Sequence, residues 1–523
     1  MTPHSRLLTG LSLAGLFALN LLSPTPTCAQ DKGPTPAQNK ACADCHRRLS
    51  PALVMEWERS THNQRRVGCL DCHQGDKSRP EAWLHEGAYV SVLVTPKTCA
   101  ACHETEFKEF TQSHHAKAGE IMASLDNVLA EKAAGMPGNN ADAVSGCWQC
   151  HGGIVKFKRD AQGQILRAGK ENKPVIDPAT WPNSGIGRLN PDGSKGSCNA
   201  CHSRHSFEPK LSRAPENCGK CHLGPDHPQT EIYNESKHGI AFHANRDKMA
   251  LTNDSWVLGK DYSAAPTCST CHLGSYMTEK GVAKGNSHDV GERISWTLRP
   301  VVSSKINQVI YEDGYKEDLP ETRPLPAIGD TVASADNVVE NEKMVNKPVQ
   351  RRVAKIVTWQ QRRSSMKGVC QNCHNNTFTD NFYQQYDDLV ALYNDKFAKP
   401  AQKLMDELAA DGAINPKAPF EHEVQWVFYE LWHHEGRRAR HGASMMGPDY
   451  THWHGMYEVS KHFYEEFLPA VAKAADDKGP ELKKKYDQEI AALLAKDEHR
   501  WKKGLSADEA EALRKNYKER YNQ

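Results

Sequence analysis

Apolar side chains recur at helical spacing in the last third of the chain, where they form four separate series. These series are Phe382, Tyr386, Leu389, Tyr393 and Phe397; Val424, Val427 and Leu431; Val459, Phe463, Phe467 and Val471; and Leu482, Tyr486, Ile490 and Leu493. Each series predicts an amphipathic helix with one buried stripe, and Pro400 is expected to end the first. The capping-box pattern from Ser506 to Glu509 predicts the start of a last helix. We therefore expect a C-terminal helical region over residues 376–523, packed on itself or on neighbouring subunits.

Strand signals are sparse in the rest of the chain, so the predicted fold class is mainly α. The stretch from Lys316 to Gln350 is rich in Pro, Glu and Asn and has little apolar periodicity. It is expected to be a long surface loop over about 316–350. The Gly-rich stretch from Gly185 to Gly193 lacks the lysine of a phosphate-binding loop. It is expected to form a turn that borders the cofactors bound by the cysteine motifs described next.

The motif Cys-x-x-Cys-His occurs eight times and uses sixteen of the seventeen cysteines. The eight sites are Cys42, Cys45 and His46; Cys69, Cys72 and His73; Cys99, Cys102 and His103; Cys147, Cys150 and His151; Cys198, Cys201 and His202; Cys218, Cys221 and His222; Cys268, Cys271 and His272; and Cys370, Cys373 and His374. Both thiols of such a motif bond to a porphyrin, and its histidine takes one axial face of the iron. A zinc or redox Cys-x-x-Cys site would not require a histidine after every second cysteine. The sequence therefore predicts eight covalently bound haem c groups within residues 30–375.

Eight porphyrins are large apolar bodies that replace much of a side-chain core. This explains how a chain with only 38% apolar residues can fold compactly. The 66 basic residues nearly balance the 65 acidic ones, so the charge does not indicate nucleic-acid or membrane binding.

The first residues have the pattern of a signal peptide over 1–29. Arg6 precedes an apolar run from Leu11 to Leu22, and Thr27-Cys28-Ala29 fits a cleavage site. Export to the periplasm, or to an equivalent compartment outside the cytoplasm, is the expectation. No other stretch approaches the ~20 apolar residues that a membrane-spanning helix needs.

The eight motifs in this order resemble the octahaem hydroxylamine oxidoreductases, a family that includes hydrazine-oxidising enzymes. The resemblance covers roughly residues 41–466, and it is carried by Arg59-Ser-Thr-His62, by His202-Ser-Arg-His205, by the run from Cys218 to His227, and by Ser236-Lys-His238. In that family seven haems have two histidine ligands and the fourth has one. The resemblance implies second ligands at His62, His85, one of His114 and His115, His205, His238, His288 and His441.

The same resemblance implies a catalytic site at the fourth haem. Asp226 and His227 match the pair that accepts protons above the open face of that haem. Tyr450, with Tyr457 as the alternative, lies where the family has a tyrosine that a neighbouring subunit of a homotrimer bonds to the fourth porphyrin.

The implied activity is oxidation of hydroxylamine or hydrazine, with electrons relayed to a soluble or membrane-bound cytochrome c. One alternative is reduction of nitrite or hydroxylamine by the same fold. Another is a non-catalytic electron-transfer cytochrome in which every iron has two protein ligands. The basic residues Arg437, Arg438 and Arg440 are expected to pair with haem propionates.

Overall fold

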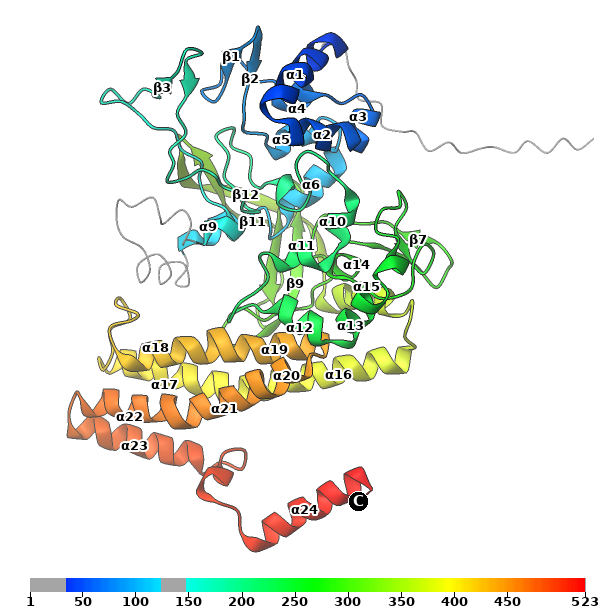
Figure 1. Ribbon diagram of the computed structural model, residues 1–523. Helices are drawn as coiled ribbons and strands as arrows, with labels where there is room; N and C mark the ends of the chain where they lie inside the picture. The colour runs from blue at the N-terminus through cyan, green and yellow to red at the C-terminus, as the bar shows by residue number, and fades with distance from the viewer. Residues whose placement is uncertain (1–33, 124–146, 523) are drawn as a thin grey trace, which may run out of the picture.

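The computed structural model describes residues 34–123 and 147–522. The expected signal peptide lies outside these residues. Figure 1 shows a body of short helices and loops formed by the first part of the chain, above a layer of long helices formed by the C-terminal part. Helix dominates the structure, so the predicted mainly α fold is confirmed.

The body consists of short elements joined by loops. Its α-helices are α1 (Pro36–Leu49), α2 (Pro51–Arg59), α3 (Thr61–Gln64), α4 (Cys69–His73), α5 (Pro96–Ala100), α6 (Glu104–Gln112), α9 (Trp148–His151), α10 (Pro209–Arg213), α11 (Pro215–Gly219), α12 (Gln229–Glu235), α13 (Lys237–Ala244), α14 (Cys268–His272) and α15 (Trp359–Cys370). Its short strands are β1 (Trp83–His85), β2 (Ala88–Val90), β3 (Arg167–Ala168), β4 (Lys173–Pro174), β5 (Val257–Leu258), β6 (Ser275–Met277), β7 (Ala283–Lys284) and β8 (Trp296–Thr297). Helices α4 and α14 span one Cys-x-x-Cys-His motif each. The Thr267 side chain caps α14 by accepting a hydrogen bond from the backbone N–H of Thr270.

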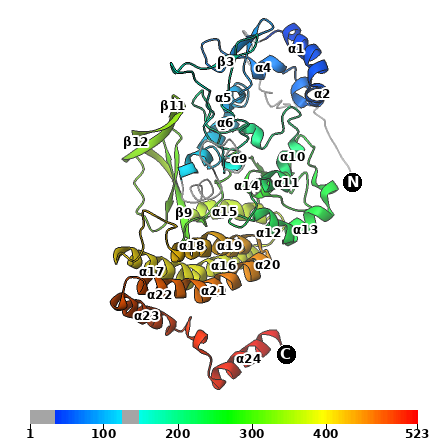
Figure 2. The same cartoon turned by 60° about the vertical axis from the view of Figure 1, so that its left-hand side comes forward.

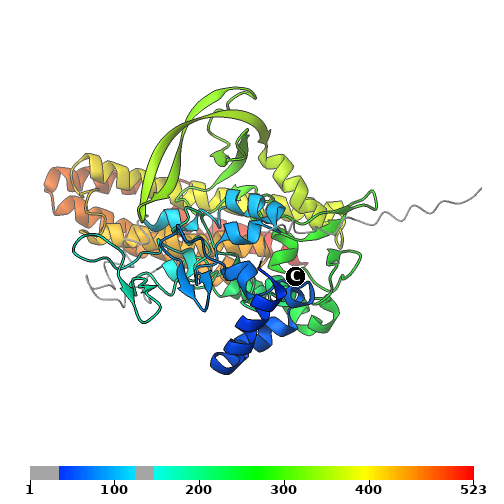
Figure 3. The ribbon, with the colours of Figure 1, turned by 90° about the horizontal axis from the view of Figure 1, so that it is seen from above.

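The prediction of a long loop over about 316–350 is wrong. The chain forms β9 (Ser304–Tyr311), β10 (Lys316–Pro320), β11 (Thr331–Glu340) and β12 (Lys343–Val357), which lie in the sheet order β10-β9-β12-β11. Strands β11 and β12 form a long antiparallel hairpin that arches over the body in Figure 3. Its turn residues, Asn341 and Glu342, both have positive φ, as a two-residue hairpin turn of type I′ requires. The sequence did not reveal these strands, because both faces of the hairpin are half exposed and carry many polar residues.

The C-terminal layer contains the predicted helices in a longer, more continuous form. These helices are α16 (Asn376–Tyr393), α17 (Lys399–Ala410), α18 (Glu423–Glu430), α19 (Gly436–Met445), α20 (Pro448–Thr451), α21 (Glu458–His462), α22 (Leu468–Asp476), α23 (Pro480–Leu494) and α24 (Ala507–Tyr521). Pro400 does not end the first series, because the π-helical turn Asn394–Ala398 carries α16 directly into α17. Proline lacks an N–H and clashes with the preceding turn inside a regular α-helix, and Pro400 stands directly after the π-helical turn, where the regular α-helical pattern is interrupted. The Ser506–Glu509 capping box opens α24 as predicted.

Figure 2 shows α16 to α23 stacked side by side beneath the body. Their apolar stripes form a core that includes Phe397, Leu404, Phe463, Phe467 and Val471, each at most 4% exposed. Of the helices described, none is long and apolar enough to cross a bilayer.

Candidate functional site: a chain of haem-attachment motifs

One continuous cavity of about 3990 Å³ runs through the body. Residues from all eight Cys-x-x-Cys-His motifs line it. An ordinary small-molecule pocket has a volume of roughly 300–1,000 Å³, so this cavity suits several large cofactors rather than one ligand. The donor set of paired thiols and imidazoles fits covalently bound haem c.

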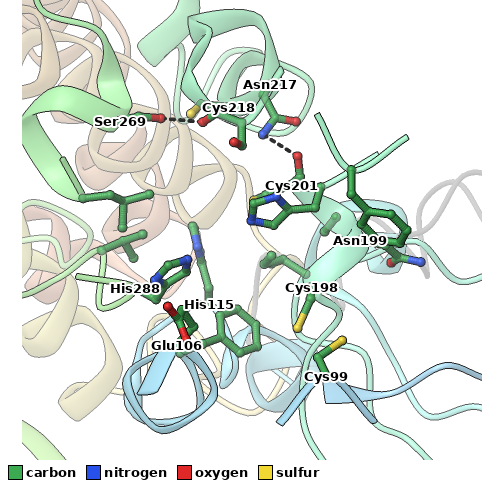
Figure 4. A pocket seen from close by; sticks show the side chains of 18 of the residues that line it. Cys99, Glu106, His115, Cys198, Asn199, Cys201, Asn217, Cys218, Ser269 and His288 are labelled. Carbon is green, nitrogen blue, oxygen red and sulfur yellow. Dashed lines mark hydrogen bonds between the residues drawn. The ribbon is translucent and has the colours of Figure 1, made fainter. Parts of the chain in front are cut away.

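Contacts between cysteines show how the motifs follow one another in space. Seven pairs of cysteines from different motifs lie close together: Cys42 and Cys69, Cys72 and Cys99, Cys99 and Cys198, Cys201 and Cys218, Cys218 and Cys268, Cys271 and Cys370, and Cys150 and Cys221. The motifs therefore run in the order first, second, third, fifth, sixth, seventh and eighth, and the fourth lies beside the sixth. Figure 4 shows one of these junctions, where Cys99 and Cys198 lie side by side.

Four motif histidines face a histidine predicted to be a second ligand. The distances between ring centroids are 6.2 Å for His46 and His85, 6.3 Å for His103 and His62, 6.3 Å for His73 and His205, and 6.2 Å for His374 and His238. Bonds from a metal to imidazole nitrogens are about 2.0–2.1 Å long, so this spacing leaves room for one iron between the two rings. The structure thus brings these four pairs together from distant parts of the sequence.

His288 and His441 also lie among the motif histidines. Burial lowers the pKa of His202 to about 4, and His288 is the first imidazole that lowers it further. Figure 4 shows His288 and His115 pointing into the same cavity. Burial lowers the pKa of His441 to about 3, helped by nearby arginines, and the ring lies close to His227 and His222. The imidazoles of His202 and His441 are therefore neutral near pH 7, which is the form that binds a metal.

Neighbouring groups fix the orientation of several of these rings. The Nδ1 atoms of His73 and His272 lie 2.9 Å and 3.2 Å from the carbonyl oxygens of Ser91 and Val290. The Nδ1 of His85 lies 2.7 Å from a carboxylate oxygen of Glu171. Such a contact holds the proton on Nδ1 and leaves Nε2 free for iron.

The choice between His114 and His115 follows from their different surroundings. The Nε2 of His114 lies 2.9 Å from Asp318 Oδ2, and the ring is partly exposed. His115 is oriented inward, 6.1 Å from the ring of His222, and burial lowers its pKa to about 3. We therefore propose His115, rather than His114, as the iron ligand.

Replacing His115 by alanine is expected to convert one six-coordinate, low-spin haem into a high-spin haem that binds carbon monoxide. The matched variant His114→Ala should leave the number of such haems unchanged, because that imidazole contacts Asp318 instead. Electron paramagnetic resonance and carbon monoxide titration of both proteins would measure this number. A gain of a high-spin haem in His114→Ala alone would contradict the assignment.

Asp318 should make stability depend on pH in the acid range. Burial raises its pKa, but hydrogen bonds from His114 and Arg362 outweigh burial and lower it from 3.8 to about 2. A lowered folded-state pKa stabilises the fold above the unfolded value, and this contribution is lost as the pH falls toward 2. The shift corresponds to about 2 kcal/mol. Urea titrations should show that the stability difference between the natural protein and Asp318→Asn narrows between about pH 5 and pH 2. A stability difference that stays constant over this pH range would contradict the lowered pKa of Asp318.

The fourth motif is held by a glycine-rich segment, the one predicted to border a haem. The backbone N–H groups of Ile186 and Gly187 donate to the carbonyl oxygens of Cys150 and His151 at 2.9 Å and 3.0 Å. A Cβ atom on Gly187 would lie 2.4 Å from the backbone nitrogen of Gly119 and 2.7 Å from the His151 oxygen. Only glycine allows the two backbones to approach this closely.

Asp226 and His227 lie beside the sixth motif, which adjoins the fourth through Cys150 and Cys221. Both line the cavity, and the His227 ring centroid is 6.2 Å from that of His222 in the adjoining sixth motif. The Asp226 Oδ1 atom is 3.5 Å from His227 Nε2, and Asp226 Oδ2 is 3.6 Å from Arg437 Nη1. Among the described residues, the buried Nδ1 of His227 has no hydrogen-bond partner. The pair therefore offers a carboxylate and an imidazole nitrogen to a small molecule in the cavity.

Tyr450 lies on α20, outside the described lining of the cavity. Its backbone N–H donates to Glu235 at 3.2 Å, and its ring lies 5.5 Å from that of His454. Trp453 and Tyr457 nearby are 56% and 52% exposed. Within its own chain Tyr450 does not reach the cavity, so any role at a porphyrin would require a neighbouring subunit.

Several functional partners were not predicted from the sequence. Glu171, Asp318 and the carbonyl oxygens of Ser91 and Val290 orient histidines, and Arg437 contacts Asp226. The expectation of propionate pairing is wrong for Arg440, whose guanidinium donates to the Gly436, Pro300 and Trp432 carbonyls and to Ser303. Arg438 pairs with Glu435 and Glu458. These partners lie far apart in the sequence or in ordinary polar positions, so no local pattern indicates them.

Comparisons with known proteins match parts of this chain to multihaem cytochromes. The family profile described as "Seven times multi-haem cytochrome CxxCH" matches residues 192–322, and "Cytochrome c554 and c-prime" matches residues 98–171. A "Probable nitrite reductase-hydroxylamine oxidoreductase fusion protein" from Kuenenia stuttgartiensis is 22% identical over 409 residues, which cover 72% of this chain. The chain spans only 38% of the length of that relative.

Two solved structures share the fold. A "Hypothetical multiheme protein" aligns with a TM-score of 0.64 and 24% identity, covering 84% of this chain and 96% of its own. The "Kuenenia stuttgartiensis reducing HAO-like protein complex Kustc0457/Kustc0458" aligns with a TM-score of 0.53 and 18% identity, covering 87% of each chain. At these identities the likeness establishes a common fold.

Proposed function

We propose that this chain, a multihaem cytochrome c of the hydroxylamine oxidoreductase-like family, is an exported octahaem oxidoreductase of small inorganic nitrogen compounds. Its substrate site is the haem attached through Cys147 and Cys150, with His151 as the only protein ligand of the iron. The observation that carries the proposal is the Asp226–His227 pair, which lines the cavity beside His222 of the sixth motif, and the sixth motif in turn adjoins the fourth.

A haem held by Cys147, Cys150 and His151 would supply a binding place for a small nitrogen compound and a route for its electrons. The residues around it handle the protons. Every N–H or O–H bond that an oxidation breaks releases a proton, and a carboxylate or imidazole within hydrogen-bond reach can accept it. Asp226 and His227 are the groups placed to do so, and His227 presents a buried Nδ1 with no partner among the described residues.

The remaining seven motifs would relay electrons. The cysteine contacts connect the fourth motif to the sixth, and from there lead to the first motif in one direction and to the eighth in the other. The proposed acceptor at the end of this relay is a cytochrome c, soluble or membrane-bound.

We propose oxidation of hydroxylamine, or hydrazine, as the direction of catalysis. The support is Tyr450, which sits on a partly exposed helix beside Trp453 and Tyr457, where a second subunit of a homotrimer could receive it. A tyrosine bonded to the porphyrin would mark the oxidative members of the family.

Reduction is the second candidate. The relative from Kuenenia stuttgartiensis is named as a fusion with a nitrite reductase, and one structural neighbour is named a reducing complex. The same proton-handling pair would then donate protons to a nitrogen oxide while the relay carries electrons inward.

Turnover assays combined with mass spectrometry would test these candidates. Purified protein with its haems attached would be assayed with hydroxylamine and hydrazine plus an electron acceptor, and with nitrite plus a donor. A haem peptide that carries both Cys147–Cys150 and Tyr450, together with hydroxylamine turnover, is the expected result. Nitrite turnover without that crosslink would favour reduction. If the protein turns over none of these compounds and has only low-spin haems, the result would support a non-catalytic electron-transfer cytochrome.

A further inference from the structure

The Arg437 guanidinium occupies a defined place behind the proposed catalytic pair. Arg437 lies in the first turn of α19, and its side chain is almost completely buried. Its Nη1 atom is 3.6 Å from Asp226 Oδ2, while the other carboxylate oxygen, Oδ1, is 3.5 Å from His227 Nε2. The Asp226 carboxylate is thus held between a cation and the imidazole, one oxygen toward each.

Backbone and side-chain acceptors hold the guanidinium itself. Its Nε and Nη2 atoms donate to the Arg299 carbonyl oxygen at 3.2 Å and 3.0 Å, and Nη1 lies 3.0 Å from His433 Nε2. Arginine can only donate, so His433 Nε2 is the acceptor in this contact. His433 is buried and stacks on Tyr429 with ring centroids 4.4 Å apart. The Arg299 carbonyl and His433 therefore hold the planar guanidinium in place independently of its contact with Asp226.

We propose that Arg437 is a positioning residue that orients the Asp226 carboxylate for proton transfer. This inference rests on the proposed function of Asp226. Without the guanidinium, the carboxylate could rotate away from His227 and from the substrate. Misplacement of a catalytic group by about 1 Å can cost on the order of 10²-fold in rate. The competing possibility is that Arg437 pairs with a haem propionate and acts independently of Asp226.

A double-mutant cycle separates these two roles. Turnover of the protein with its haems attached would be measured for Arg437→Gln, for Asp226→Asn and for the double variant. We expect Arg437→Gln to lower kcat about 10- to 100-fold in the natural background, and less than about threefold in the Asp226→Asn background. Arg437→Lys should restore part of the loss, because lysine supplies the charge but not the planar fork. It also provides a second test if the glutamine variant does not assemble.

Arg363→Gln is the matched control. Arg363 is another nearly buried arginine that pairs with a carboxylate, since both Nη atoms lie 2.7 Å from the carboxylate oxygens of Asp387. If Arg363→Gln lowers kcat, we expect it to do so by the same factor in the natural background and in the Asp226→Asn background. Spectra of haem content and spin state in every variant would show whether the relay is intact.

Two results would overturn the inference while leaving the proposed function in place. The first is a loss from Arg437→Gln that multiplies with that of Asp226→Asn, as propionate pairing predicts. The second is full activity of Arg437→Gln while Asp226→Asn is impaired. If Asp226→Asn itself keeps full activity, the proposed function fails, and this inference fails with it.

Discussion

Asparagine in place of Asp226 is expected to lower kcat for hydroxylamine by about 10²- to 10⁴-fold, the usual contribution of a general base. The substitution keeps the size of the side chain and its capacity to accept from Arg437, but removes the carboxylate charge that takes up protons. The side chain that lies 3.5 Å from His227 would then carry no negative charge.

The measurement is steady-state turnover of protein with complete haem content. Asp388→Asn is a suitable control, because Asp388 is an exposed carboxylate on α16 that contacts only Gln384 in the hydrogen bonds described. Full activity of Asp226→Asn, with all haems present, would exclude Asp226 as the proton acceptor.

Alanine in place of Phe463 is expected to lower the free energy of unfolding of the C-terminal layer by about 3–5 kcal/mol. Phe463 is fully buried. Its ring packs edge-on against Phe397 with centroids 5.3 Å apart and stacks on Phe467 at 5.8 Å. Its loss would remove buried apolar contacts and leave a cavity that the surrounding helices cannot fill without moving.

Urea denaturation followed by far-ultraviolet circular dichroism would measure this effect. Leu392→Ala on α16 serves as the control, because Leu392 is 47% exposed and its truncation opens no cavity. Equal midpoints for Phe463→Ala and Leu392→Ala would contradict the packing that the structure shows.

The layer of C-terminal helices could be predicted because its signal is local. Phe397 and Phe463 belong to series whose period is that of a helix, and the structure buries both. Pro400 misled the prediction because a π-helical turn, which has no clear sequence signature, lets the helix continue past it. The hairpin β11–β12 was missed because a ribbon exposed on both faces has no alternation of apolar and polar residues to reveal it.

The haem-attachment sites could be predicted from the sequence alone, because each is a run of five residues that needs no distant partner. Pairing is different. His73 and His205, or Asp226 and Arg437, meet across 132 and 211 positions of the chain, from the differences in their residue numbers. Tertiary structure decided which imidazoles face one another, that His115 rather than His114 is oriented toward the motif histidines, and which groups hold Asp226 beside the sixth motif. These contacts depend on loop paths and close packing around the cavity, which no short stretch of residues encodes.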